Sequence, residues 1–237
     1  MSVEDSIIKS LASHADATKA AFLPQFFKAL PGGYGEGDAF IGVSVPNQRK
    51  TAKQFYKQAD LNDVSALLQH PVHEHRLTAL FILVLKYEKA KGESEKQEIV
   101  DTYLRNLHAV NNWDLVDSSA DKILGSYLYD RDRELLYDLV NSGELWKQRI
   151  AIISTFYFIK KKDFSDTLKL AEILLSHEHD LIHKAVGWML REIGNRNFDV
   201  EYEFLAKFYR QMPRTMLRYA IEKFEEDLRQ KFLKGKI

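Results

Sequence analysis

The 237-residue chain contains no cysteine, only five prolines and no net charge. Without cysteine it can form neither a disulfide framework nor a cysteine-based zinc site. Its 34 basic and 34 acidic residues balance, so net charge gives no sign of a nucleic-acid partner, although a local basic groove can exist on a neutral chain. The 45% of hydrophobic and 29% of charged residues are typical of a soluble globular protein.

Long apolar runs are missing as well. No run approaches the roughly 18 residues that a membrane span needs. The first residues, Met1-Ser2-Val3-Glu4-Asp5, lack the charged start and apolar run of a signal peptide. We therefore expect a cytoplasmic protein that does not contact a membrane.

Glycine is scarce and concentrated, because four of the eleven glycines lie between Pro31 and Asp38. This stretch is a loop rather than a phosphate-binding loop, since it lacks a Gly-Lys-Ser/Thr ending and follows no strand. We interpret residues 40–43 as a buried connector. Ser44 and Pro46 then favour the start of a helix, with Ser44 as its cap.

Helical spacing of apolar residues is present almost everywhere, and no segment shows a convincing alternation of period two. Residues 3–30 predict two helices. The further helices are predicted at 45–58, 61–69, 73–90, 94–107, 113–129, 132–141, 145–161, 164–177, 181–195, 199–211 and 213–232. Short connections imply that neighbouring helices are antiparallel. The predicted fold class is all-α.

Every second helix resembles the others in sequence. Taking Arg76, Asp117, Arg149, Lys184 and Arg214 as equivalent gives steps of 41, 32, 35 and 30 residues. This is the size of a two-helix repeat, and the uneven step favours degenerate HEAT-like repeats over tetratricopeptide repeats. We expect one α-α superhelix, or solenoid, over residues 1–237, whose alternate helices line a concave binding face.

The stretch Asn111–Ser119 is the most informative part of the chain. Trp113 and Asp117 are four residues apart, so an indole and a carboxylate share one helical face. One interpretation is structural, an acid favoured by the start of a helix beside a core tryptophan. The other interpretation is a functional pair, and the rest of the concave face favours it.

Cations dominate the first turns of the other inward-facing helices. The residues expected on this face, besides Trp113 and Asp117, are His73, His75, Arg76, Lys147, Arg149, His183, Lys184, Trp188, Arg214 and Arg218. Helix N-termini and arginine side chains both suit phosphate groups. In this row Asp117 is the acid among cations, which indicates a role of its own.

A metal site is the competing interpretation for His70, His73 and His75 with Glu74. Their spacing does not match the helical zinc motifs, so we expect neither a metal nor another cofactor. The chain also offers no cysteine nucleophile, and no Ser/His/Asp set can be placed from the sequence.

Three motifs resemble a known family. Residues 112–118 (Asn-Trp-Asp-Leu-Val-Asp-Ser), 145–151 (Leu-Trp-Lys-Gln-Arg-Ile-Ala) and 184–192 (Lys-Ala-Val-Gly-Trp-Met-Leu-Arg-Glu) are similar to the bacterial AlkD-type DNA alkylation repair proteins. So is the segment 42–46, and the likeness covers about residues 20–225. Members of that family are HEAT-like repeat DNA glycosylases that release N3-methyladenine and N7-methylguanine.

The resemblance implies a role for each matched position. The family's catalytic aspartate falls on Asp117, and its two active-site tryptophans fall on Trp113 and Trp188. Its backbone-contacting arginine falls on Arg149, and Arg191 adds a further phosphate contact. With these we group the cations Lys147, Lys184 and Arg214 as DNA-backbone contacts.

The expected function is therefore base excision repair by a monomeric glycosylase that binds double-stranded DNA containing alkylated bases. Asp117 would stabilise the sugar cation and position water. The resemblance implies capture of the lesion's backbone without a base-specific pocket. The loop from Pro31 to Asp38 looks longer than its family counterpart and would affect the range of substrates. The alternatives are a non-catalytic protein that binds unusual DNA structures and a scaffold for protein partners.

Overall fold

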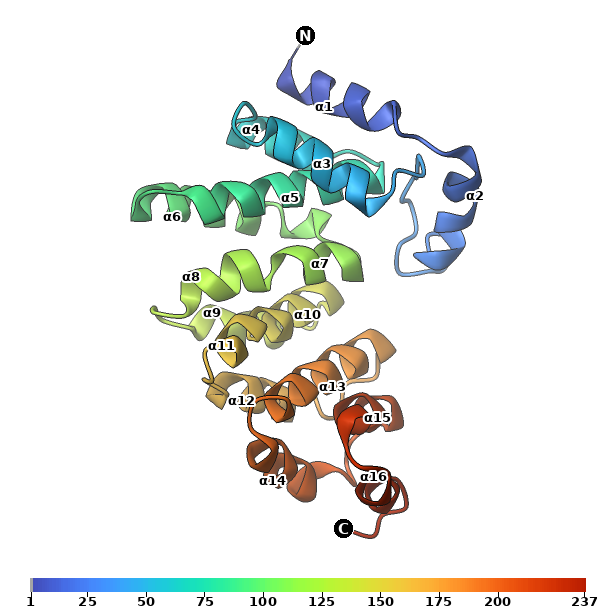
Figure 1. The fold of residues 1–237 in the computed structure, drawn as a ribbon, viewed down its shortest axis with the longest axis vertical. Helices are drawn as coiled ribbons and strands as arrows, with labels where there is room; N and C mark the ends of the chain where they lie inside the picture. Colours follow the sequence, from blue (N-terminus) through green and yellow to red (C-terminus); the bar gives the residue numbers. More distant parts are fainter. Residues whose placement is uncertain (1) are drawn as a thin grey trace. The chain divides into compact units, whose positions relative to one another are not determined.

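The computed structural model describes residues 2–237 and is all-α, as predicted (Figure 1). Within these residues, pairing of the strand type is confined to one isolated bridge between Ala39 and Val72. The chain forms two compact units, unit 1 ending at Ser119 and unit 2 beginning at Ala120. A single domain over residues 1–237 stays a prediction. No helix in the described part of the chain has the length and apolar character needed to cross a bilayer.

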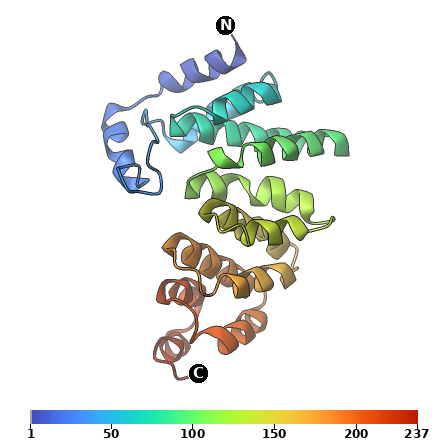
Figure 2. The same ribbon diagram turned by 180° about the vertical axis from the view of Figure 1, so that it is seen from behind.

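Unit 1 is built around one long buried helix. Its elements are α1 (Val3–Ala12), α2 (Ala17–Phe26), α3 (Val45–Phe55), α4 (Leu61–Leu68), α5 (His73–Lys89), α6 (Glu93–Arg105), the 3-10 turn η1 (Leu107–Ala109) and α7 (Trp113–Ser119). Helices α3, α4, α6 and α7 all pack against α5 (Figure 2). Residues 73–84 of α5 are buried without interruption, as expected for a helix surrounded by others.

The connection between α2 and α3 is held by one carboxylate. Glu74, at the start of α5, accepts hydrogen bonds from the backbone N–H groups of Ile41, Gly42 and Val43, the Gly42 bond measuring 2.8 Å. Gly42 has a φ of +80°, and a Cβ there would lie 2.0 Å from the carbonyl oxygen of Asp16. Glycine is therefore required at this position. The residue at the start of α3, Ser44, caps the helix only by position, since its side chain makes no capping hydrogen bond.

Unit 2 is centred on another long helix, α13. Its elements are the π turn η2 (Asp121–Gly125), α8 (Ser126–Leu128), α9 (Glu134–Val140), α10 (Leu145–Ser154), α11 (Phe156–Lys160), α12 (Ser165–Ile173), α13 (Asp180–Gly194), α14 (Phe198–Phe208), α15 (Arg214–Ala220), the 3-10 turn η3 (Ile221–Lys223) and α16 (Glu226–Leu233). Helices α10, α12, α14 and α15 pack against α13. Close approach to α15 depends on Gly187, where a Cβ would lie 2.4 Å from the carbonyl oxygen of Met216.

Three predicted helices are interrupted. In 113–129 the backbone widens into the π turn, where the Gly125 N–H bonds to the Ala120 carbonyl. In 145–161 the helix breaks at Thr155, whose hydroxyl bonds back to Ile152 at 2.7 Å. In 213–232 the backbone becomes extended at Phe224, which places its buried ring against Phe232. The spacing of apolar residues does not reveal any of these three breaks.

Candidate functional site

Trp113 and Asp117 lie on one face at the start of α7, as predicted. Asn112 fixes this start: its fully buried side chain accepts the N–H of Trp113 at 2.9 Å. Buried Leu115 and Val116 seat the helix on the core of unit 1. The side chains of Trp113 and Asp117 are both half-buried. An indole and a carboxylate are thus held together on a fixed helix and are partly open to solvent.

Beneath Trp113 lies a buried ionic network that joins three segments. His73 contacts Asp38 through Nδ1 and Asp114 through Nε2, both at 2.9 Å. Arg76 donates to the other Asp38 oxygen at 2.7 Å and to the carbonyl of His70 at 3.1 Å. The loop, α5 and α7 are therefore tied together by charges that water barely reaches.

Burial controls the protonation of this network. Burial alone would lower the pKa of His73, but hydrogen bonds to Asp114 and Asp38 outweigh it and raise the pKa to about 9. Burial alone would raise the pKa of Asp38, yet His73 and Arg76 hold that pKa below its usual value. His75 has no such partner, so burial together with the charge of His70 lowers its pKa to about 4. His73 is therefore charged at neutral pH, and His75 is neutral.

The expected contribution of His73, His75 and Arg76 to an exposed binding face is wrong. These three residues are only 1%, 3% and 5% exposed, respectively. Among the described residues no group of three acids and histidines is arranged to hold a metal ion. His73 and Arg76 instead belong to the buried network beneath α7, and His75 is buried beside His70.

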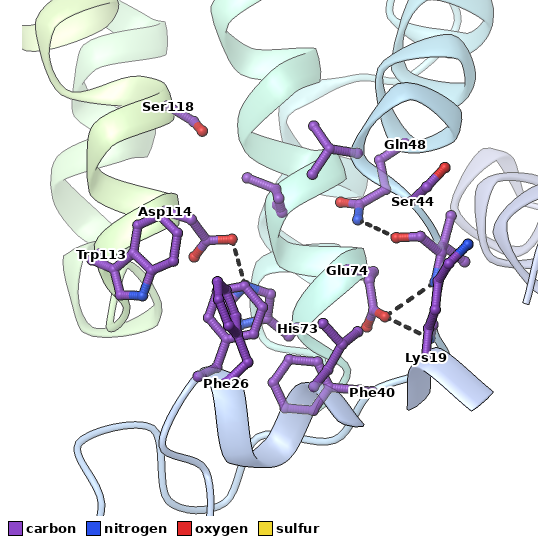
Figure 3. A pocket seen from close by; sticks show the side chains of 16 residues that line it. Lys19, Phe26, Phe40, Ser44, Gln48, His73, Glu74, Trp113, Asp114 and Ser118 are labelled. Atoms are coloured by element: carbon purple, nitrogen blue, oxygen red, sulfur yellow. Dashed lines mark hydrogen bonds and ion pairs between the residues drawn. The ribbon is translucent and has the colours of Figure 1, made fainter. Parts of the chain in front are cut away.

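Next to the network is a pocket of about 320 Å³ that lies entirely within unit 1 (Figure 3). Its walls carry the aromatic side chains of Phe26, Phe27, Phe40, His73 and Trp113. Phe27 stacks on Trp113 with ring centroids 5.5 Å apart, and Phe40 stacks on Phe27 at 5.5 Å. This pocket could not be predicted from sequence patterns, because its walls come from α2, the loop, α3, α5 and α7.

Asp114 is the functional candidate that the sequence analysis missed. It is a neighbour of Trp113 in the motif, lines the pocket and bonds to His73, which lies 41 residues away. Local spacing connects Trp113 with Asp117 but gives no reason to connect Asp114 with His73. Only the packing of α7 on α5 reveals that contact.

In unit 2, Trp188 lies half-buried on α13 within an aromatic and ionic cluster. Its ring is 5.6 Å from that of Phe156, and its Nε1 donates to Glu192 at 3.3 Å. The ammonium of Lys160 lies 4.1 Å from the centre of the Phe156 ring, a cation–π contact. Trp188 therefore packs against an aromatic ring and donates a hydrogen bond to an acid, and its place in a row of cations stays a prediction.

The predicted DNA-backbone cations are in unit 2, and each has a partner there. Lys147 pairs with Glu144 at 2.6 Å and Lys184 with Asp180 at 2.7 Å. Arg191 pairs with Glu222, and Arg214 donates to the carbonyl of Leu233 at 2.9 Å.

Arg149 differs from the other four cations. It is 4% exposed and donates to the carbonyl of Leu181 in the first turn of α13. The guanidinium is therefore inside unit 2 rather than on its surface. In this position it holds the start of the helix that carries Lys184 and Trp188.

The positions of these residues in their helices refine the repeat. Arg76 lies three residues after the start of α5, and Asp117, Arg149 and Lys184 each lie four residues after the starts of α7, α10 and α13. Arg214 instead begins α15, so Arg218 matches Asp117 in position. Trp113 and Asp117 belong to unit 1, and Trp188 and the predicted cations belong to unit 2. Their assembly into one groove stays a prediction.

The fold of this chain is similar to that of a known structure. A solved structure described as a predicted DNA alkylation repair enzyme from Enterococcus faecalis is similar, with a TM-score of 0.71 and 18% sequence identity over 90% of this chain and 98% of that one. At this identity the likeness shows the fold, a helical repeat. The comparison with curated proteins gives no match.

The family comparison covers nearly the whole chain. The model of the family described as DNA alkylation repair enzyme matches residues 7–224, a range that includes α7, α10, α13 and the predicted site residues on them. This chain therefore belongs to the DNA alkylation repair enzyme family.

Proposed function

We propose that this family member is a monofunctional DNA glycosylase that hydrolyses the N-glycosidic bond of cationic alkylated purines, N3-methyladenine and N7-methylguanine, in duplex DNA. It would act as a monomer in the cytoplasm. The observation that carries the proposal is the pair Trp113 and Asp117, half-buried on one face of α7 in a chain of the alkylation repair family.

The chemistry needs little acid catalysis. An N-alkylated purine is already a cation, so the glycosidic electron pair leaves with the base and neutralises it. Positive charge then develops on the deoxyribose, and a nearby carboxylate stabilises that charge. Asp117 serves this role. A water molecule adds to the sugar carbon, and the proton it loses passes to Asp117 or to solvent.

The indoles support this step by packing. Trp113 is held against Phe27, and Trp188 against Phe156, so each presents a rigid aromatic face. Such faces exclude water and favour a nearby cation through their quadrupoles.

The cations of unit 2 would hold the DNA backbone. The side chains of Lys147 and Lys184 are 36% and 39% exposed, and their present carboxylate partners are exposed too. Exposed pairs of this kind are weak, so phosphates can replace the carboxylates. Arg191, whose side chain is 19% exposed, would have to release the carboxylate of Glu222, and Arg214 the backbone carbonyl of Leu233. Arg149 must release the Leu181 carbonyl before it can bind a phosphate.

The decisive experiment is base release by Asp117→Asn. Removing the charge while keeping the side-chain shape should lower excision of N7-methylguanine from duplex DNA by about tenfold or more, equivalent to at least about 1.4 kcal/mol of transition-state stabilisation. Released base is measured by chromatography under single-turnover conditions. Asp101→Asn, an acid on α6 outside the proposed site, is the matched control. Wild-type excision by a folded Asp117→Asn variant would sink the assignment. DNA binding without any base release by the wild type would favour the non-catalytic alternative.

A second test measures the backbone contacts. Lys147→Ala should weaken DNA binding and reduce the slope of log K against log salt by about 1, since one phosphate contact is lost. Arg149→Ala should do the same if its guanidinium reaches DNA. Because Arg149 is buried, its variant must be checked for folding by circular dichroism. An unchanged slope in a folded variant would remove that residue from the phosphate-binding set.

A further inference from the structure

His73, the first residue of α5, contacts both the carboxylate next to Trp113 and the ring that stacks on Trp113. Its Nε2 lies 2.9 Å from the carboxylate of Asp114 (Figure 3). Its ring centroid is 4.6 Å from that of Phe27, and Phe27 stacks on Trp113 at 5.5 Å. His73 is only 1% exposed, so it does not reach DNA itself. Any effect of His73 on the proposed reaction must therefore pass through these neighbours.

The orientation of the Trp113 indole depends on the rings around it. Asn112 accepts the backbone N–H of Trp113 at 2.9 Å, which fixes the backbone but leaves the side chain free to choose a rotamer. Phe27 stacks on the indole with the two planes 23° apart, and Phe26 contacts it edge-on at 5.9 Å. Phe26 is 49% exposed, whereas Phe27 is 8% exposed. Phe27 is therefore the firmer support of the indole.

Phe27 itself packs against His73 and Phe40. The ring planes of Phe27 and Phe40 are 10° apart, and the Phe40 ring lies 5.2 Å from the ring of His73. Aromatic rings attract a positive charge, and the attraction is strongest where water is excluded. A charged His73 therefore holds both phenylalanine rings in place beneath Trp113.

The contacts of His73 require its charged form. Its Nδ1 lies 2.9 Å from Asp38 and its Nε2 lies 2.9 Å from Asp114, so both nitrogens face carboxylates. Only the protonated imidazole carries a hydrogen on both nitrogens, whereas the neutral ring can donate to one carboxylate alone. Asp38 also accepts from Arg76 at 2.7 Å, but Oδ1 of Asp114 has no hydrogen bond within the described residues. Asp114 is therefore the acid that is held less firmly once His73 loses its proton.

The charges around His73 set the pH at which this happens. Burial and the charge of Arg76 lower the pKa of His73, but hydrogen bonds to Asp114 and Asp38 outweigh them and raise it to about 9. The charged groups around the ring are Asp38 from the loop, Asp114 from α7, Lys19 from α2, and Glu74 and Arg76 from its own helix. His73 is therefore charged at neutral pH and becomes neutral at mildly alkaline pH.

We propose that His73 is a positioning residue for the proposed hydrolysis. It acts on Trp113 through Asp114 and Phe27, and holds the indole with its face against the sugar that Asp117 stabilises. A small misplacement of a group beside the reacting atoms slows catalysis strongly, so a residue that never touches DNA can still set the rate. This role rests on the proposed function, because it serves the step in which Asp117 acts.

Kinetics separate positioning from binding. His73→Gln keeps a polar side chain that can donate to one carboxylate but removes the charge. Single-turnover excision of N7-methylguanine with saturating protein should fall about tenfold or more, while the dissociation constant for the same duplex changes by less than about twofold. A role in stability alone would leave the rate of the saturated, folded protein unchanged. His75→Gln, which removes a buried histidine of α5 that has no carboxylate partner, is the matched control and should change neither quantity.

Asp114→Asn tests the same path from α7. It keeps the shape of the side chain and removes the charge that faces His73, while the pairing of His73 with Asp38 remains. This variant should also excise slowly and bind normally, and it decides the matter if His73→Gln does not fold. Wild-type rates in the folded variants, or a loss of binding as large as the loss of rate, overturn the assignment.

Tryptophan fluorescence follows Trp113 without DNA. The chain has three tryptophans, so Trp146→Phe together with Trp188→Phe leaves Trp113 as the reporter. Its quenching by acrylamide should rise as pH increases through about 9, where His73 loses its proton. His73→Gln should give the higher quenching already at pH 7, and His75→Gln should behave like the unsubstituted reporter. A reporter that neither pH nor His73→Gln alters would contradict the positioning role.

The two measurements also separate this role from the proposed function. Base release by the wild type, combined with an unresponsive reporter and an unchanged rate in His73→Gln, would overturn the role of His73 alone. A reporter that responds to His73 in a protein that releases no base would refute the proposed hydrolysis, while the control of Trp113 by His73 would stand.

Discussion

The two units of this protein use charge in different ways. In unit 1 the side chains of Asp38, His73 and Arg76 are 4%, 2% and 6% exposed, and His73 and Arg76 both bond to Asp38. In unit 2 the side chains of Lys184 and its partner Asp180 are 39% and 54% exposed. Buried pairs are rigid and strongly coupled to folding, whereas exposed pairs contribute little and exchange easily.

The buried charges of unit 1 support a helix, whereas the exposed charges of unit 2 are the ones proposed to bind phosphates. The unit 1 network lies beneath α7 and fixes the start of the helix that carries Trp113 and Asp117. In unit 2 the side chains of Lys147 and Lys184 are partly exposed and paired with exposed carboxylates, whereas Arg149 is buried. The proposed function has phosphates displace those carboxylates. A neutral chain can therefore still present exchangeable positive charge on one unit.

The largest effect is expected from breaking the buried network. Asp38→Asn leaves Arg76 and protonated His73 buried without their shared carboxylate, which typically costs about 3–5 kcal/mol. The free energy of unfolding is measured by urea denaturation at pH 7. Asp138→Asn, at an exposed position of α9, controls for the loss of one acid. A loss below about 1 kcal/mol for Asp38→Asn would show that burial does not distinguish these pairs.

The network also predicts a pH window. The folded pKa of His73, about 9, is above its unfolded value of 6.5, so its stabilising contribution is complete below 6.5 and is lost as pH rises through 9. The folded pKa of Asp38 is below its unfolded value of 3.8, so its contribution is present above that value and is lost at lower pH. The stability difference between wild type and Asp38→Asn should therefore shrink at both extremes.

A smaller effect is expected from Glu201, an acid of unit 2 that breaks the pattern. It is 2% exposed, its Oε1 has no hydrogen bond, and burial raises its pKa to about 8 despite the nearby charge of Arg191. The unfolded chain releases this proton near pH 4.5, so stability falls as pH rises from 4.5 to 8. Glu201→Gln should gain about 1–3 kcal/mol at pH 7 and nothing at pH 4.

Urea denaturation at the two pH values checks this gain. Glu203→Gln, an exposed acid on the same helix, should show no pH-dependent gain. Equal changes at pH 4 and pH 7 in Glu201→Gln would exclude a buried neutral carboxyl as the cause.

The smallest effect is expected from the exposed pair. Lys184→Gln should lower the free energy of unfolding by about 0–1 kcal/mol, because Lys184 and Asp180 are both solvated. The same variant should weaken DNA binding and reduce its salt slope by about 1. A large loss of stability with unchanged DNA binding would reverse the roles given to this pair.

The sequence by itself determined the local features. The helices follow from apolar spacing, and the shared face of Trp113 and Asp117 follows from a separation of four residues, which fixes the angle between side chains on any α-helix. The positions of Arg149 and Lys184, each four residues after the start of its helix, follow from the repeat in the same way. Such features depend only on neighbours in the chain.

Tertiary structure alone decided which charges are buried. His73 and Asp114 are 41 residues apart and meet because α7 packs on α5, and Arg149 is covered because its helix packs against α13. The aromatic pocket likewise requires α2, α3, α5 and α7 together. A residue at a helix start has the same sequence signature whether another helix covers it or solvent does. Contacts between segments that are distant in the sequence decide whether such a residue is buried or exposed. Helical periodicity does not predict those contacts.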